Sequence, residues 1–321
     1  MNTRIGYIDS LKGVGIILVM MSHMCSCKYL TPFYGGFIPL FFIASGLTSK
    51  SIEVTNDTLR LKAKRLLLPY VFYSLTIVSL FSLFALDRDL LQNIMGIFYA
   101  RCRILKDSVV DLNIGLLPRE IAPLWFLPAM FVAYVSIFVC KIRGGQIAMC
   151  IITIIASMFP IIWPWSFDTA FVHGLFVLVG YRYKDYFKSI SFKKVVLILP
   201  VYLLLFYFNK MPNISISAYG IRGIFSIPCY FLLGIIETMV ILYFCKVTDK
   251  YKISSVFRYL GRNSLRLMCI HMGVFTYYDE YSKIPNSIKI VFTLIIVFIL
   301  TYFIEFLVVH FGNKNILLKS I

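Results

Sequence analysis

The sequence predicts an all-α fold, a polytopic membrane bundle of about ten transmembrane helices with both termini in the cytoplasm. Hydrophobic residues make up 60% of the 321 residues and charged residues only 15%, whereas a soluble chain has about 25% charged residues. The apolar residues come in runs of about 20, the length that crosses a hydrocarbon core of about 30 Å. Because these runs recur along the whole chain, we expect one transmembrane domain over residues 1–321 and no separate soluble domain.

The predicted spans follow the apolar runs in chain order. Several are short or interrupted by Pro or Gly, and we find no internal repeat of the kind that marks an inverted-repeat transporter. No small-residue cleavage site follows residues 1–22, so we expect the first run to stay in the protein as a spanning helix. The expected spans are approximately 8–27, 34–50, 66–86, 121–141, 146–164, 168–183, 194–209, 223–246, 263–279 and 287–310.

The distribution of basic residues sets the orientation. With the N-terminus in the cytoplasm, most of the 32 Lys and Arg residues fall in cytoplasmic segments, as the positive-inside rule requires. The net charge of +17 is therefore a topology signal and does not indicate nucleic-acid binding. The largest outer segment, residues 87–120, carries five basic and five acidic residues. It is either a solvated loop or a lid for a polar ligand on the outer face.

Three ionisable residues share one face of the first span. Lys12 and His23 are eleven residues apart, which is about 1,100° of helical rotation, or about 20° past three full turns, and about 16 Å along the axis. Asp9 precedes Lys12 by three residues and lies on the same face. Gly13 and Gly15 would let another helix or a ligand come close.

Each of these residues has a simple structural interpretation and a functional one. Asp9 is either a helix-start acid or an orienting partner of His23. Lys12 either extends to the cytoplasmic interface or holds the phosphate or carboxylate groups of a donor. His23 is either a satisfied structural histidine or a base, since neutral imidazole can take a proton from a sugar hydroxyl that attacks an acyl carbonyl. Ionisable residues at this depth usually face the protein interior, which favours function.

At these residues the chain resembles acyltransferase family 3, membrane acyltransferases that modify cell-surface polysaccharides and lipids. Lys12-x10-His23 is similar to the basic residue and histidine of the family's first helix, although many members have Arg at the first position. Residues 38–47, IPLFFIASGL, resemble the family's F-F-x-x-S-G segment. Lys62-x-x-Arg65 resembles its R-x-x-R element, again with Lys first. Similar segments are APLWFL at 122–127 and LGRNSL at 260–265, with His271 beyond.

The resemblance implies a function and a set of site residues. The donor would be a cytoplasmic acyl-CoA, usually acetyl-CoA, with no permanently bound cofactor and no metal. The acceptor would be a surface glycan or a lipid-linked glycan precursor, reached from the outer side of the bacterial cytoplasmic (inner) membrane. His23 would be the catalytic base, and Lys12, Lys62 and Arg65 would bind the donor. The alternative for the last two is positive-inside charge alone.

Five further residues are candidates for lining the pocket or the acceptor site. Ser45 is a nucleophile without a base in its local sequence, or a packing residue. Trp125 belongs to an interfacial belt or stacks on a sugar ring. Glu237, like Glu305, is a carboxylate in an apolar run that needs a histidine or arginine partner. The five candidates are Ser45, Trp125, Glu237, Asn263 and His271.

The remaining histidines and the cysteines carry structural predictions. His173 and His310 lie near span ends, and we expect them at the membrane interface. The eight cysteines lie mostly in apolar runs, and Cys25 and Cys27 form only a C-x-C pair. We expect small buried side chains there, with a zinc or disulfide role as the alternative.

The sequence thus favours a membrane O-acyltransferase, in the first place an O-acetyltransferase. Direct transfer through a tunnel and a covalent acyl-histidine intermediate are both open. The alternative function is a proton-coupled transporter or flippase of a glycan or acyl donor, and a third is a structural partner in polysaccharide synthesis. The partners would be acyl-CoA, the glycan acceptor and membrane lipids, with no nucleic acid, and the sequence leaves open whether the chain forms a homo-oligomer.

Overall fold

The computed structural model describes residues 5–24, 37–51, 53–84, 90–101, 117–158, 163–209 and 220–311. Within these ranges the chain is helical and contains no strand, so the all-α prediction is confirmed. Four helices are long and apolar enough to cross a membrane, over Asn56–Leu83, Arg119–Val139, Ile227–Thr248 and Asn286–Val308. The number of ten crossings and the cytoplasmic location of the termini stay predictions.

A helix overlaps each of the ten expected spans, and three helices lie in segments expected to be loops, namely α4, α8 and α11. The elements are α1 Gly6–Met24, α2 Phe37–Thr48, α3 Asn56–Phe84, α4 Leu90–Tyr99, η2 Arg119–Trp125, α5 Phe126–Val139, α6 Gly145–Met158, η3 Pro164–Ser166, α7 Ala170–Arg182, α8 Lys184–Lys188, α9 Phe192–Asn209, α10 Gly220–Thr248, α11 Ile253–Arg262, α12 Ser264–Tyr281 and α13 Asn286–Phe311.

The start of α3 differs most from the prediction. The helix begins at Asn56 rather than near residue 66, so the basic pair Lys62 and Arg65 lies on a helix and not in a loop. The start is encoded by Thr55 and Thr58, because the Thr55 hydroxyl accepts a hydrogen bond from the Thr58 backbone N–H at 3.3 Å and the Thr55 N–H donates to the Thr58 hydroxyl at 2.5 Å. This reciprocal pattern caps the first turn.

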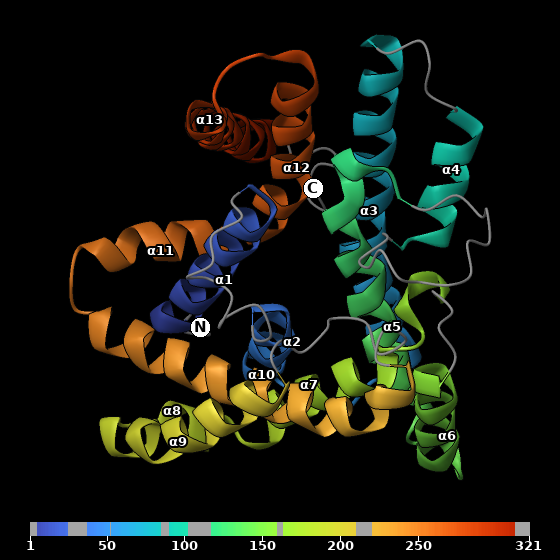
Figure 1. Cartoon of the computed structure of the whole chain (residues 1–321), viewed down its shortest axis with the longest axis vertical. Coiled ribbons are helices and arrows are strands. Elements are labelled where there is room, and N and C mark those ends of the chain that lie inside the picture. The colour runs from blue at the N-terminus through green and yellow to red at the C-terminus, as the bar shows by residue number, and fades with distance from the viewer. Residues whose placement is uncertain are drawn as a thin grey trace.

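Helix α1 lies at the centre of the molecule and contacts α2, α10, α11 and α12, most extensively α11 (Figure 1). Glycine permits this contact, because a Cβ at Gly13 would collide with the carbonyl oxygen of Phe257 and a Cβ at Gly261 would collide with that of Asp9. The backbones of α1 and α11 therefore touch directly. This packing turns the polar face of α1 toward its neighbouring helices.

A second backbone contact joins α2 to α7. A Cβ at Gly46 would collide with the carbonyl oxygen of Val177, and a Cβ at Gly180 with that of Ile43. The Ser-Gly step of the predicted F-F-x-x-S-G segment thus has a packing role at its glycine. The contact fixes the face of α2 that carries Ser45.

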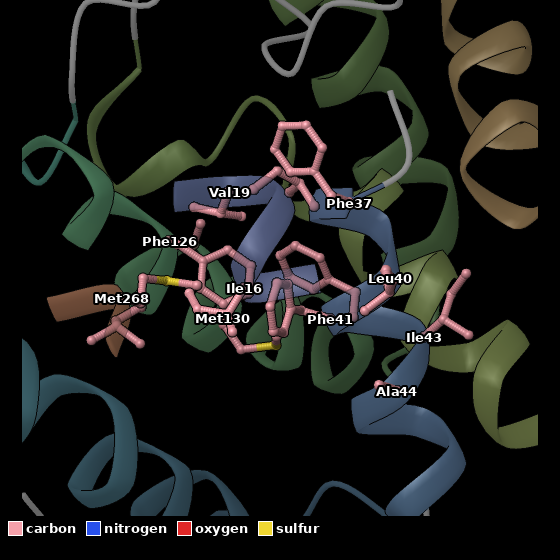
Figure 2. Close-up of a cluster of buried hydrophobic side chains, with 14 of the residues drawn as sticks. Ile16, Val19, Phe37, Leu40, Phe41, Ile43, Ala44, Phe126, Met130 and Met268 are labelled. Carbon is pink, nitrogen blue, oxygen red and sulfur yellow. The ribbon is translucent and has the colours of Figure 1, made fainter. Parts of the chain in front are cut away.

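Apolar side chains from four helices meet in the core between these contacts (Figure 2). The residues come from α1, α2, α5 and α12, and all are buried. By contrast, α3, α6, α9 and α13 expose many large apolar side chains on their outer faces, as helices in contact with hydrocarbon do. The labelled core residues are Ile16, Val19, Phe37, Leu40, Phe41, Ile43, Ala44, Phe126, Met130 and Met268.

The α1–α11 contact makes a testable prediction about stability. Replacement of Gly13 with Ala places a methyl group against the Phe257 carbonyl, and we expect a loss of about 1–3 kcal/mol in the free energy of unfolding. The matched control is Gly273→Ala, where the nearest atom to the new methyl would be an Ile77 side-chain carbon at 3.3 Å. Because Ala has a higher helix propensity than Gly, we expect Gly273→Ala to be as stable as the wild type. Thermal unfolding of the purified variants in detergent measures both, and equal midpoints for the two variants would contradict the contact.

Candidate functional site

A pocket of about 250 Å³ opens between α1, α2, α3, α5 and α12. Its volume lies just below that of typical ligand sites, about 300–1,000 Å³, so it suits part of a ligand. Four of the residues predicted from the sequence line it together, namely Lys12, Ser45, Lys62 and Arg65. The remaining lining residues are Phe41, Thr48, Leu66, Phe126, Leu127, Met130, Tyr134, Ser264, Leu265 and Met268.

Two helices supply the positive charge of this pocket. Lys12 comes from α1, while Lys62 and Arg65 are three residues apart on α3, a spacing that places both side chains on one face of the helix. A loop would leave their directions unspecified, so the early start of α3 is what brings the two together. Three cations around one pocket favour an anionic ligand.

Tyr134 of α5 links the basic residues to Ser45. The Lys62 ammonium donates to the Tyr134 hydroxyl at 2.8 Å and lies 4.0 Å from the centroid of its ring. The Tyr134 and Ser45 hydroxyls are hydrogen-bonded at 2.6 Å. Ser45 is therefore tied to a tyrosine and a lysine rather than to a histidine. Sequence reasoning missed Tyr134, whose only signal is a tyrosine within an apolar run.

His23 and His271 face each other at the far end of α1. Their ring centroids are 5.6 Å apart with a tilt of 38° between the planes. His271 is fully buried, and its Nδ1 lies 2.9 Å from the carbonyl oxygen of Leu267. Because a carbonyl only accepts hydrogen bonds, Nδ1 carries the proton and Nε2 carries the lone pair. Among the described residues the His271 Nε2 has no hydrogen-bond partner, whereas the His23 side chain is exposed.

The pocket and the histidine pair are joined by the same two helices, α1 and α12. Met268 lines the pocket and precedes His271 by three residues, about 5 Å along α12. On α1 the distance from Lys12 to His23 is about 16 Å along a continuous helix. The buried side chains in Figure 2, including Phe41 and Met130, come from the helices between the two ends. A polar end, an apolar middle and an imidazole end thus follow one another.

The prediction that Asp9 orients His23 is wrong. The two residues are fourteen positions apart on the unbroken helix α1, about 21 Å along its axis. Asp9 is buried, and its Oδ2 lies 3.5 Å from Nε of Arg262 on α11. Its carboxylate therefore strengthens the same α1–α11 contact that the glycines allow.

Asn263 joins three helices at the other end of α12. Its side-chain amide donates to Glu305 Oε2 on α13 at 3.4 Å and to the Tyr259 carbonyl of α11 at 3.3 Å. Its Oδ1 accepts a hydrogen bond from Arg266 at 2.7 Å. Asn263 is next to the pocket residue Ser264 but bonds to this network. Glu305 thereby gains a partner that the sequence did not identify.

Glu237 and Trp125 lie in other parts of the molecule. Glu237 is buried on α10, close to the hydroxyls of Tyr202 and Tyr230. Trp125 is buried, so it is not a residue of an exposed aromatic belt, and the Arg101 guanidinium lies 5.4 Å from its ring centroid. In the described structure both residues therefore pack away from the pocket lining.

Arg101 is the centre of a buried polar cluster just after α4, within the segment 87–120. It is 1% exposed, donates to the Ser166 hydroxyl, and forms an ion pair of 3.1 Å with Asp168. His173, which we expected at the interface, is fully buried one turn beyond Asp168, with its ring stacked 4.3 Å from that of Phe42. Arg101 thus anchors the end of the described stretch 90–101 to η3 and to the turn before α7.

The described residues contain no group of three His, Cys, Asp or Glu side chains that could hold a metal ion. Cys25 and Cys27 lie outside the described residues, and the described cysteines are unpaired thiols.

Comparison with protein families gives one match. The model of acyltransferase family 3, described as an acyltransferase domain, matches residues 5–309, nearly the whole chain. No curated protein and no solved structure matches the chain.

Substitutions at the buried Arg101–Asp168 ion pair distinguish the loss of the charge pairing from the loss of side-chain packing. We expect Arg101→Leu and Asp168→Leu each to lose about 3–5 kcal/mol of stability, because each leaves one buried charge without its partner. The double variant removes both charges and should lose less than the sum of the single losses. Thermal unfolding of the three variants in detergent measures the coupling, and simple additivity would contradict it.

Proposed function

The chain belongs to acyltransferase family 3, and from this premise we propose that it is a membrane O-acyltransferase that uses cytoplasmic acyl-CoA. The first candidate for the donor is acetyl-CoA, and the acceptor is a hydroxyl of a surface glycan or of a lipid-linked glycan precursor. One observation carries the proposal, namely that a basic pocket and an exposed histidine lie at the two ends of one face of α1.

The basic pocket suits the phosphates of the donor. Arg65 can grip a phosphate with two parallel N–H donors, while Lys12 and Lys62 act as point charges. Tyr134 holds Lys62 in place through its hydroxyl, so one cation is pre-positioned. In the orientation that the positive-inside rule favours, this end of α1 and α3 lies toward the cytoplasm, where acyl-CoA is present.

The apolar middle of the path suits the arm that links the phosphates to the thioester. Its side chains are buried and come from α1, α2, α5 and α12, so the arm would pass between helices rather than through lipid. The thioester would then reach His23, which also meets the acceptor from the opposite side. The setting that we propose is the bacterial inner membrane, which the chain would cross several times.

His23 supplies the proton transfer. Its neutral imidazole takes the proton of the acceptor hydroxyl as the oxygen forms a bond to the thioester carbonyl carbon. The carbon–sulfur bond then breaks, and the leaving thiolate receives a proton from the imidazolium. This direct transfer needs no second acyl carrier, and an acyl-histidine intermediate is the variant in which His23 attacks first.

His271 is a positioning residue for His23. Its Nδ1–H is committed to the Leu267 carbonyl, so its Nε2 lone pair is available to accept the N–H of the facing His23 ring. When formed, such a bond would fix the His23 tautomer and leave the other His23 nitrogen as the base. Gln at position 271 retains an acceptor, whereas Leu removes it. We expect His271→Gln to keep more activity than His271→Leu, and equal losses would contradict the positioning role.

The direct test of the function uses membranes supplied with radiolabelled acetyl-CoA and the glycan fraction of the native host. We expect His23→Ala to lower acetyl transfer by about 10²–10⁴-fold, the usual contribution of a general base. The matched control is Ser22→Ala on the same helical turn, since the Ser22 hydroxyl bonds only to the Val19 carbonyl in the described structure. Unchanged transfer by correctly inserted His23→Ala would overturn the assignment. No transfer by the wild type, together with protein-dependent glycan export, would favour a transporter or flippase.

The donor pocket is tested by the dependence of the rate on acetyl-CoA concentration. Lys62→Met should raise the KM for acetyl-CoA at least about tenfold, because a charged hydrogen bond contributes about 1.5–3 kcal/mol. Lys64→Met removes the same charge from the same helix at a residue outside the pocket lining. We expect the KM of this control to stay at the wild-type value. An equal rise in both variants would show that only the overall positive charge matters.

A further inference from the structure

An apolar cleft of about 390 Å³ opens on the side of the molecule formed by α3, α12 and α13. Its volume lies in the range of ligand sites. Its walls are made almost entirely of aliphatic and tyrosine side chains, among them Ile77 and Leu80 of α3, Val274 and Tyr277 of α12 and Leu300 of α13. At its floor α3 and α12 approach closely, since a Cβ at Gly273 would lie 3.3 Å from the Ile77 side chain.

The surroundings of the cleft indicate hydrocarbon as the occupant. Helix α13 is one of the four helices that can cross a membrane, and only 17% of its apolar window is buried. Water would find few polar partners in such a cleft, so a lipid chain fills it best. Tyr277, Tyr278 and Tyr281 cluster at one end of the cleft, near the end of α12. Tyrosines gather at the level of the lipid head groups, so this end of the cleft lies at the membrane surface.

The same end of the cleft carries two basic side chains. Arg119 and Lys289 share one carboxylate, that of Asp279, at 2.7 Å and 3.2 Å. Arg119 is half exposed and its guanidinium has five N–H donors, so donors remain for a further anion. In the nearby chain, Glu280 and Lys283 balance each other. Because the buried Glu120 lies next to Arg119, the charges at this end cancel, and the N–H donors that remain on the half-exposed Arg119 are what complements a lipid with a phosphate head group.

Helix α12 connects the cleft to the proposed chemistry. His271 faces α1, while Gly273 and Tyr277 line the cleft. Asp279 is eight residues beyond His271, about 12 Å along the helix. A phosphate held by Arg119 and Lys289 would thus lie about 12 Å along α12 from the histidine pair, a distance that the sugars attached to it would have to span by folding back toward His23.

We propose that the α3–α12–α13 cleft binds the hydrocarbon chain of a phosphate-bearing membrane lipid, whose phosphate lies at Arg119 and Lys289 and which carries the glycan acceptor. The proposal rests on the proposed function for the role of the lipid, but the binding itself does not depend on it. If the proposal holds, the acceptor is a lipid-linked glycan rather than a soluble one.

Binding is tested by photolabelling of the full-length protein in nanodiscs. The probes are a long-chain alkyl phosphate with a diazirine in the chain and the corresponding alcohol with the same chain. We expect labels on α3, α12 and α13 at the cleft, with the phosphate probe labelling at least fivefold more than the alcohol. Arg119→Gln combined with Lys289→Gln should abolish this preference. Equal labelling by the two probes would overturn the phosphate site, and labels spread evenly over the exposed faces of α6, α9 and α13 would show annular lipid only.

A matched pair of variants on α13 tests the cleft itself. Leu300→Trp fills the cleft, whereas Ile299→Trp adds the same bulk to the neighbouring residue, which is 60% exposed and outside the cleft lining. We expect only Leu300→Trp to lower labelling by the phosphate probe, at least fivefold, with both variants eluting as intact protein on gel filtration. Equal labelling of the two variants would contradict the site.

Acetyl transfer separates the two proposals. If the cleft is labelled as expected but the wild type transfers no acetyl group, the proposed function fails and the lipid site stands. If the wild type acetylates a soluble glycan and Leu300→Trp does so equally well, the acceptor is not lipid-linked and the role of the cleft is overturned.

Discussion

The direct contact between the backbones of α1 and α11 sets the geometry of the rest of the site. Gly13 and Gly261 remove the side chains that would separate the two helices, and Asp9 adds an ion contact to Arg262 in the same place. With α1 held there, its polar face points toward α2, α3 and α12. Lys12 then reaches the pocket and His23 reaches His271 from the same unbroken helix, α1. One packing contact at the base of α1 thereby positions groups about 16 Å apart.

The cost of burying polar groups explains why they occur in clusters. An ionisable side chain inside an apolar bundle must find a partner, and the described structure shows several such sets. Lys62, Tyr134 and Ser45 form one, Arg101 with Asp168 forms another, and Asn263 with Arg266 and Glu305 forms a third. In the histidine pair the buried His271 keeps a ring nitrogen without a partner in the described structure, as His173 does, but it faces an exposed histidine, His23. An unsatisfied acceptor beside an accessible base is the arrangement expected of a reaction site rather than of a structural lock.

The sequence predicted the parts of the fold and the site that depend on local pattern. Apolar runs predicted the all-helical bundle, and helical spacing placed Lys12 and His23 on one face of α1. The motif resemblance predicted the family, and it also named Lys62, Arg65 and Ser45, which the structure brings to the same pocket as Lys12. What local pattern could not give was contact between distant segments. Tyr134 reaches Lys62 across 72 residues of chain, and Asp9 finds its partner on α11 rather than at His23. The burial of His173 and Trp125 was missed for the same reason, since both contact segments far away in the sequence, and their depth in the membrane stays a prediction.

The central claim is that the basic pocket and the histidine pair are two ends of one path for the acyl donor. A cryo-electron microscopy structure of the protein with a non-hydrolysable acetyl-CoA analogue tests this claim most directly. We expect density for the phosphates at Lys12, Lys62 and Arg65, density for the arm between α1, α2, α5 and α12, and the acyl carbonyl beside His23. Density that placed the carbonyl at Ser45 and Tyr134, or the whole donor outside the pocket, would contradict it.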